Sequence, residues 1–205
     1  TAPDKVTNNG YDYSWGYGLR LGWHGSFSER LSAGASLQTR LLMTRFDDYA
    51  GLFAERGDFD VPATLMAGLA FDATPDVTLV FDWQRIFYSD VAAISNNNNV
   101  APAALALGSD DGAGFGWKDI DIFKLGVQWQ YDPSLTLRAG VSYADQLFEN
   151  GQALFNILAP ATIRTHASVG MTYQLGDDSA LTLAYTRAFP QKIRGTSQLT
   201  GAQQG

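Results

Sequence analysis

The clearest pattern in the chain lies at residues 11–27, which read YDYSWGYGLRLGWHGSF. Almost all of the odd positions are aromatic or aliphatic, whereas the even positions are polar or glycine. A period of two places these sets on opposite faces of a β-strand. The predicted strand of about 17 residues is longer than most strands of soluble proteins. Its polar face is rich in glycine and serine, which suits a crowded barrel lumen.

The same alternation recurs along the chain. In residues 120–131, for example, Phe123 and Leu125 share one face and Lys124 lies on the other. The predicted strands cover residues 11–27, 31–44, 61–71, 77–88, 120–131, 135–143, 161–175 and 181–189. Strands of one kind in series predict an all-β fold, namely an antiparallel meander.

The connections between these strands are alternately short and long. Short links with turn chemistry, such as Asp132-Pro133-Ser134, alternate with long links at residues 45–60, 89–119 and 144–160. Aromatic residues gather near both ends of the strands, as they do at the two headgroup levels of a bilayer. Together these features predict a transmembrane β-barrel. The alternative is a soluble antiparallel sandwich, whose outer face would carry more charges.

Composition excludes several other classes of protein. The chain has 205 residues, no cysteine, 21 acidic and 14 basic residues, and a net charge of −7. Because few cations could neutralise phosphates, we predict no nucleic-acid partner. Disulfides and thiolate metal sites are excluded, and no apolar run approaches the ~20 residues of a spanning helix. No cluster has metal-ligand spacing and the glycine-rich stretches lack a P-loop lysine, so we predict no metal and no cofactor.

Several motifs in sequence order resemble the outer-membrane long-chain fatty acid transporter family (the FadL/TodX type). The resemblance runs through nearly the whole chain. It rests on Phe53–Asp60, Tyr88–Val91, Gly114–Asp119, Lys124–Val127, Leu135–Tyr143 and Phe155–Pro160.

This resemblance implies a barrel of about fourteen strands, plugged by an N-terminal hatch, in the bacterial outer membrane. It implies passive uptake of hydrophobic small molecules, either long-chain fatty acids or aromatic hydrocarbons, by a protein that is surrounded by outer-membrane lipid and monomeric when complete. The chain departs from the family pattern, because the hatch, the early kinked strand and the last strand are absent. We therefore expect residues 1–205 to form one partial barrel region, the sixth to thirteenth strands of a larger barrel.

A fatty acid requires an apolar wall with a cation near one end. Lys118 follows the aromatic pair Phe115 and Trp117, and the resemblance places a basic headgroup-binding residue at about this point. Alternatively, Lys118 is solvated in a loop or pairs with Asp119 or Asp121.

Two long loops carry further candidates for substrate binding. Residues 47–57 predict a short helix that begins at Asp47 or Asp48 and ends at Gly57, and it carries Leu52 and Phe53. In the family, two long extracellular loops form a first groove for hydrophobic substrates. Phe155, Ile157 and Leu158 occupy a later loop. Alternatively, these residues only pack their loops onto the rim of the barrel. The run Asn96–Asn99 is a low-complexity loop.

The predicted lumen face also carries charge. Arg20, Arg40, Arg138 and Arg164 are expected there, paired with acidic groups because a buried charge must be paired. Arg164 is in addition a candidate substrate-binding residue.

A second functional hypothesis is a lipid-modifying enzyme on a small outer-membrane barrel. His166 and Ser168 share the lumen face, and Asp82 is a possible lumen carboxylate. Nucleophilic catalysis requires serine, base and acid within hydrogen-bond reach. A histidine that bonds to neighbouring polar groups of the lumen wall is the simpler interpretation, so we predict no catalytic residue.

Overall fold

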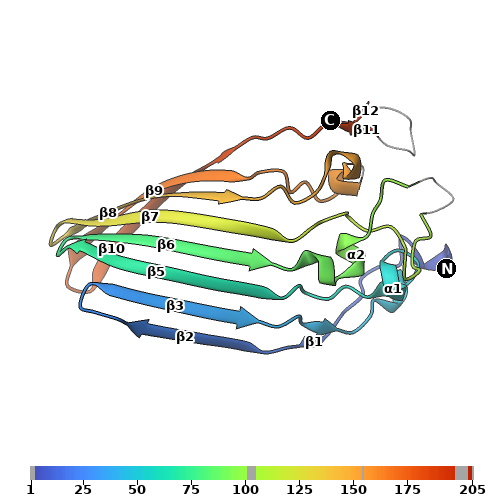
Figure 1. The fold of residues 1–205 in the computed structure, drawn as a ribbon, viewed down its shortest axis with the longest axis horizontal. Coiled ribbons are helices and arrows are strands. Elements are labelled where there is room, and N and C mark those ends of the chain that lie inside the picture. The colour runs from blue at the N-terminus through green and yellow to red at the C-terminus, as the bar shows by residue number, and fades with distance from the viewer. Residues whose placement is uncertain (1–2, 101–104, 154, 197–202, 205) are drawn as a thin grey trace.

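A computed structural model describes residues 3–100, 105–153, 155–196 and 203–204. Its centre is an eight-stranded antiparallel sheet in which each strand pairs with its neighbours in the sequence (Figure 1). The strands are β2 (Arg20–Ser26), β3 (Leu31–Gln38), β5 (Thr64–Thr74), β6 (Val77–Ile86), β7 (Ile120–Asp132), β8 (Leu135–Ala144), β9 (Thr165–Gly176) and β10 (Ser179–Phe189). The all-β antiparallel meander is therefore confirmed.

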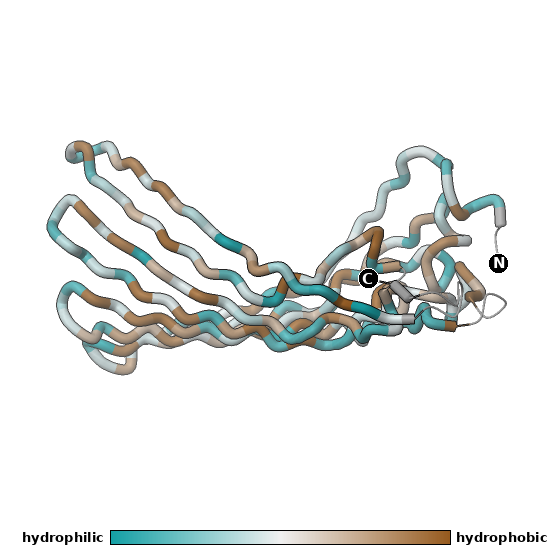
Figure 2. Tube along the Cα trace, turned by 90° about the horizontal axis from the view of Figure 1, so that it is seen from above, coloured by the Kyte–Doolittle hydropathy of each residue, from teal (hydrophilic) through white to brown (hydrophobic). Residues whose placement is uncertain are grey.

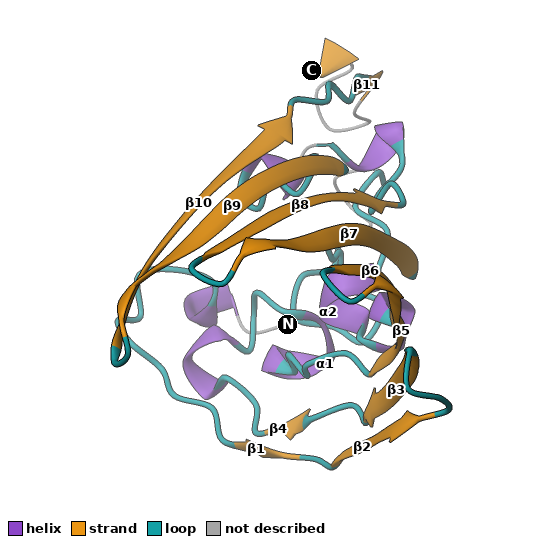
Figure 3. Ribbon diagram, turned by 90° about the vertical axis from the view of Figure 1, so that its left-hand side faces the viewer, coloured by secondary structure: helices purple, strands orange, loops and turns teal. Residues whose placement is uncertain are grey.

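The sheet is strongly curved but open. Seen end-on, it is bent into an arc (Figure 3). The helices α1 (Ala54–Gly57) and α2 (Ala92–Ser95) lie beyond one end of its strands (Figure 1). Its strand order runs from β10 to β2 without pairing between these two strands, which are the edges of the described sheet. Among the described residues, no helix is long and apolar enough to cross a membrane.

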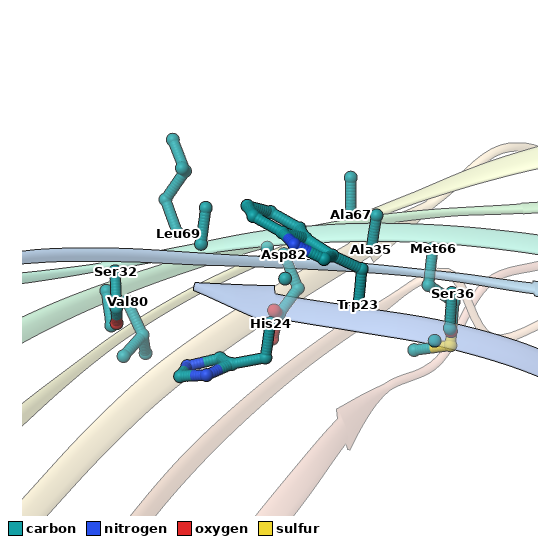
Figure 4. Close-up of a pocket in the computed structure, with 15 residues that line it drawn as sticks. Trp23, His24, Ser32, Ala35, Ser36, Met66, Ala67, Leu69, Val80 and Asp82 are labelled. Carbon is teal, nitrogen blue, oxygen red and sulfur yellow. The ribbon is translucent and has the colours of Figure 1, made fainter. Parts of the chain in front are cut away.

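The strand register lines up the apolar positions into continuous rows. One row joins Trp83, Phe123, Tyr143, Thr165 and Phe189 across five strands. The alternation is visible along every strand in Figure 2. In Figure 4, Trp23, Ala35, Ala67 and Leu69 lie on one side of the sheet, and His24, Ser36 and Met66 lie on the concave side. Odd positions thus occupy the convex face, as the sequence predicts.

The first predicted strand is shorter than residues 11–27. Only β1 (Gly16–Tyr17) and β2 are strands, and β1 pairs with the two-residue strand β4 (Leu42–Met43). Between β1 and β2, the Leu19 amide donates a hydrogen bond to the Thr39 hydroxyl at 3.0 Å, so a side chain replaces a backbone acceptor of the sheet. Residues 10–14 have no strand beside them, because the neighbouring segment turns into the 3-10 helix η2 (Asp47–Tyr49).

The two ends of the sheet differ as predicted. At one end, short turns are closed by local hydrogen bonds, such as those from the Ser134 amide and hydroxyl to the Asp132 carboxylate at 2.8 and 2.7 Å. At the other end lie the long connections (Figure 1). The connections contain η2, α1 (Ala54–Gly57), η3 (Tyr88–Asp90), α2 (Ala92–Ser95), η5 (Asn150–Gln152) and η6 (Phe155–Ile157). The terminal segments contain η1 (Pro3–Lys5), β11 (Gly195–Thr196) and β12 (Gln203–Gln204).

The predicted helix over residues 47–57 is wrong as one element. The segment forms η2 and the single turn α1, and Glu55 and Arg56 inside α1 have left-handed φ angles of 53° and 60°. No side chain caps the start of η2, so neither Asp47 nor Asp48 is a cap. The loop is held instead by contacts with other segments.

Candidate functional site

The described residues of the connections 44–63, 87–119 and 145–164 pack together beyond one end of the sheet, and we call them the loop cap. Backbone bonds join the first two loops, since the amides of Glu55 and Arg56 each donate at 3.1 Å to the carbonyls of Ser109 and Gly108. At Gly108, where φ is +77°, a Cβ atom would lie 2.4 Å from the Ala50 carbonyl oxygen. Glycine is therefore required where these loops meet.

Asparagines join the second loop to the third. The Asn98 amide side chain donates to the Gly114 carbonyl at 3.0 Å, and its backbone amide donates to Gln152 Oε1 at 2.8 Å. Asn96 donates to the carbonyls of Asp110 and Gly112. The run Asn96–Asn99 is thus a structural joint rather than a featureless loop, because short amide side chains can satisfy backbone groups locally.

An aromatic group lies where the second loop meets the third. Trp117 Nε1 donates to Asn156 Oδ1 at 2.5 Å, and the Asn156 amide donates to the Phe115 carbonyl at 2.7 Å. Trp117 also pairs with Phe148 by a β-bridge, and the Phe148 side chain is buried in a small apolar core with Ile120. These contacts fix the floor of the third loop.

A cavity of about 440 Å³ opens beside this core, between the third loop and the segment after β10. It combines apolar walls with two cations. Its lining residues are Phe148, Ala153, Asn156, Ile157, Pro160, Thr162, Gln191, Lys192, Ile193 and Arg194. The sequence analysis found Ile157 but missed Lys192 and Arg194, for which only their place after the last predicted strand was a signal.

The concave face of the sheet has a second hollow of about 640 Å³ over β2, β3, β5 and β6 (Figure 4). Most of the residues that line it are glycine, alanine and serine, including Gly22, Gly34 and Gly68. Small side chains leave free space along this wall.

Lys118 lies at the edge of the loop cap. Its side chain is exposed, and its backbone amide donates to the Leu147 carbonyl at 2.9 Å, next to the cavity-lining Phe148. Asp119 and Asp121 do not pair with Lys118, because both carboxylates bind Arg85, at 3.7 and 2.8 Å. The alternative pairing of Lys118 is therefore wrong.

The other predicted apolar residues have different surroundings. The Phe53 ring packs edge-on against Phe59 with ring centroids 5.0 Å apart and lies tilted against Phe46 at 6.1 Å, so Phe53 packs within its own loop. Leu52 and Phe155 are half-buried, and neither lines the 440 Å³ cavity. Of the predicted set, only Ile157 is brought into that cavity.

The arginines that were predicted to face the lumen have different partners. Arg40 pairs with buried Asp60 at 2.5 Å, as expected, and also donates to the Asp90 carbonyl. Arg138 bonds instead to Gln128 and Thr172, which are neutral. Arg164 stacks over the Tyr143 ring at 4.8 Å, which places its guanidinium beside a residue of the convex face rather than the lumen.

The three residues that the enzyme hypothesis requires, Ser168, His166 and Asp82, are not brought together on this sheet. His166 contacts Ser142 at 3.5 Å, whereas the Ser168 hydroxyl donates to the Gly140 carbonyl. Asp82 shares the cross-strand row of His166, but β7 and β8 lie between their strands, a separation of roughly 14 Å. Serine, base and acid are therefore too far apart to act together.

Burial changes the acidity of two groups in the loop cap. It raises the pKa of Asp58, and the nearby carboxylates of Asp60 and Glu55 raise it further. Asp58 Oδ1 is buried without a hydrogen-bond partner. Burial likewise raises the pKa of the Tyr88 phenol, whose ring packs edge-on against Trp117 at 5.2 Å.

Residues 7–204 match the model of a protein family described as outer membrane protein transport protein (OMPP1/FadL/TodX). The chain belongs to this family. It is therefore an outer-membrane β-barrel protein of the kind found in Gram-negative bacteria. Comparison with curated proteins finds no significant match.

Solved structures with the same fold include the following three proteins. The P. putida toluene transporter TodX has 20% identity and a TM-score of 0.60, with 90% of this chain and 45% of that chain covered. A Pseudomonas aeruginosa FadL homologue has 15% identity and a TM-score of 0.62, with 88% and 45% covered. The CymD monoaromatic hydrocarbon channel has 22% identity and a TM-score of 0.54, with 86% and 47% covered. The chain thus spans about half the length of these structures.

Proposed function

We propose that this protein is part of an outer-membrane uptake channel for hydrophobic compounds, in which the loop cap captures the compound and the lumen passes it on by diffusion. The observation that carries this proposal is the cavity of about 440 Å³ in the loop cap. Its walls include Phe148, Ile157 and Ile193, and burying apolar surface against such walls favours binding by roughly 25 cal/mol per Å².

The cavity also suits a ligand with a negative end. Lys192 and Arg194 line it, and Lys118 is joined by its backbone to the residue next to Phe148. A long-chain fatty acid has an alkyl tail for the walls and a carboxylate for a cation. We therefore favour long-chain fatty acids over aromatic hydrocarbons, although two of the structural neighbours are by name a toluene transporter and a monoaromatic hydrocarbon channel.

The passage below the loop cap is supported by the concave wall. Small side chains such as Gly34 and Ser36 line the hollow of about 640 Å³, and they leave room for a moving ligand. No catalytic role is proposed for His166 or Ser168.

The apolar wall can be tested with a pair of neighbouring residues. Ile157→Asp should weaken binding of every hydrophobic ligand, because Ile157 lines the cavity. Leu158→Asp should have little effect, because the neighbouring Leu158 is similarly exposed but does not line the cavity. Binding of a fluorescent long-chain fatty acid and of toluene would be measured by titration of the protein in detergent. Equal effects of the two substitutions on both ligands would contradict the proposal.

The headgroup role of Lys118 can be tested in the same assay. Because a hydrogen bond to a charged group contributes ~1.5–3 kcal/mol, Lys118→Ala should weaken fatty acid binding roughly ten- to a hundredfold. It should spare the fatty alcohol of the same chain length, and Lys118→Arg should retain most of the affinity. Equal losses for acid and alcohol would exclude a headgroup role for Lys118 and leave Lys192 and Arg194 as the cations to test.

A further inference from the structure

We propose that the convex face of β8, β9 and β10 binds the phosphate-bearing headgroup of an outer-membrane lipid through Arg164 and Arg187. The proposal rests on the membrane location of the sheet and not on the transported compound. It begins from two arginines that lie where a lipid-facing surface is normally apolar.

Strand register places Arg187 in an apolar row. The row joins Phe81, Leu125, Val141, Ala167 and Arg187, and the next row toward the loop cap contains Tyr143, Thr165 and Phe189. The Arg187 guanidinium stacks over the Phe189 ring at 5.5 Å. The side chain is therefore turned toward the membrane surface, as long cationic side chains at an interface usually are.

Arg164 reaches the same level from the neighbouring loop. Its guanidinium stacks over the Tyr143 ring at 4.8 Å, and its Nε donates to the Ala144 carbonyl at 3.0 Å. Tyr143 and Phe189 both pair with Thr165, so their strands are separated only by β9, a distance of roughly 10 Å. Two cations are thus held at one level of the bilayer, on a surface about as wide as one lipid headgroup.

These two cations lack a carboxylate partner in the part of the chain that the structure describes. The ion pairs found there involve Arg40 and Arg85, and Arg85 is on the convex face at nearly the same level. Because Asp119 and Asp121 neutralise Arg85, it has no free charge for an external anion. Arg164 donates hydrogen bonds to the Tyr143 hydroxyl and the Ala144 carbonyl, but these neutral groups do not balance its charge. A cation without a counter-charge at the edge of the hydrocarbon is costly, which favours an anion bound from outside the chain.

A phosphorylated lipid supplies that anion and explains the surface below it. Guanidinium groups bind phosphate oxygens by two parallel hydrogen bonds. Beside and below Arg187 the same face is apolar and open, with Val141 54%, Val169 58% and Tyr185 66% exposed. Acyl chains would cover these side chains, whereas a free phosphate ion would leave them bare.

The test uses the full chain in detergent with diphosphoryl lipid A, a glycolipid with phosphate monoesters, as the probe. Native mass spectrometry would count bound lipid as its concentration rises. The double variant Arg164→Gln/Arg187→Gln should weaken binding at least about tenfold, since it removes the charged donors. Arg187→Lys alone should retain most of it. The matched control Arg138→Gln removes a cation from the opposite face of β8 and should leave binding unchanged.

Three results would overturn the proposal. The first is unchanged lipid binding by the double variant when its strand content by circular dichroism matches the unaltered protein. The second is an equal loss in Arg138→Gln, which would indicate a general charge effect. The third is full displacement of the lipid by millimolar inorganic phosphate, which would indicate a site for the free ion. Because none of these measurements uses a fatty acid or toluene, their outcome is independent of the transport proposal.

Discussion

The sheet and the loop cap differ in how far their apolar side chains are exposed. In the sheet, convex-face residues remain open, as Leu125 at 59% exposure illustrates. In the loop cap, Phe148 and Val91 are each 1% exposed, and most buried residues of the described chain lie there. The sheet therefore depends on the bilayer for its apolar partner, whereas the loop cap is a small globular unit with its own core. Four substitutions test this difference.

The largest effect is expected from emptying the core of the loop cap. Phe148→Ala should destabilise the third loop by about 3–5 kcal/mol, because it removes a fully buried ring and leaves a cavity. Hydrogen exchange of residues 145–164, followed by mass spectrometry in lipid vesicles, would measure local opening. Leu158→Ala, at an exposed position of the same loop, should change it by no more than about 0.5 kcal/mol. Similar exchange in both variants would mean that the loop cap has no core of its own.

The next effect concerns the face that the bilayer covers. Leu125→Arg, in the middle of β7 on the convex face, should cost about 2–4 kcal/mol, because it places a charge in hydrocarbon. The control Ser168→Arg places the same charge on the concave face of β9 and should cost much less. Urea-dependent folding into phosphatidylcholine vesicles would give both values. The assignment of faces would be reversed if the Ser168 variant were the less stable one.

The joint between the second and third loops should have an intermediate effect. Asn98→Ala leaves the Gly114 carbonyl without its donor in a buried position and should cost about 1–3 kcal/mol. Asn97→Ala is the neighbouring control, because Asn97 is exposed and water can replace its hydrogen bonds. Hydrogen exchange of both loops would be compared. Independent opening of the two loops in the unaltered protein would contradict the role of Asn98.

The smallest effect is a dependence on pH. The pKa of Asp58 in the folded loop lies above its ordinary value of 3.8. Its protonation therefore stabilises the folded loop, and this contribution is lost as the pH rises through the folded-state pKa. After correction for intrinsic exchange rates, residues 44–63 should open more readily at about pH 7 than at about pH 4. Asp58→Asn should remove this difference, whereas Asp110→Asn, at an exposed site, should retain it. A difference that persists in Asp58→Asn would assign it to another group.

The sequence by itself determined where the strands lie, because the alternation of apolar and polar side chains is visible within each segment alone. Six of the eight predicted strands match observed strands within about four residues at each end. The other two, predicted over residues 11–27 and 31–44, are each broken into a longer and a two-residue strand near η2. The family was also evident from short ordered motifs such as Gly114–Asp119, and the family model confirms it.

Only the tertiary structure decided which side chains meet in the loop cap. Lys192 and Arg194 line the same cavity as Ile157 because the segment after β10 lies beside the third loop. The alternation of apolar and polar residues in the sequence does not indicate which loops lie side by side. Likewise, the joint at Asn98 and the position of Arg164 over Tyr143 depend on contacts between segments distant in sequence or on neighbouring strands. Strand periodicity is a local feature that one segment displays by itself, whereas a loop contact depends on two segments at once.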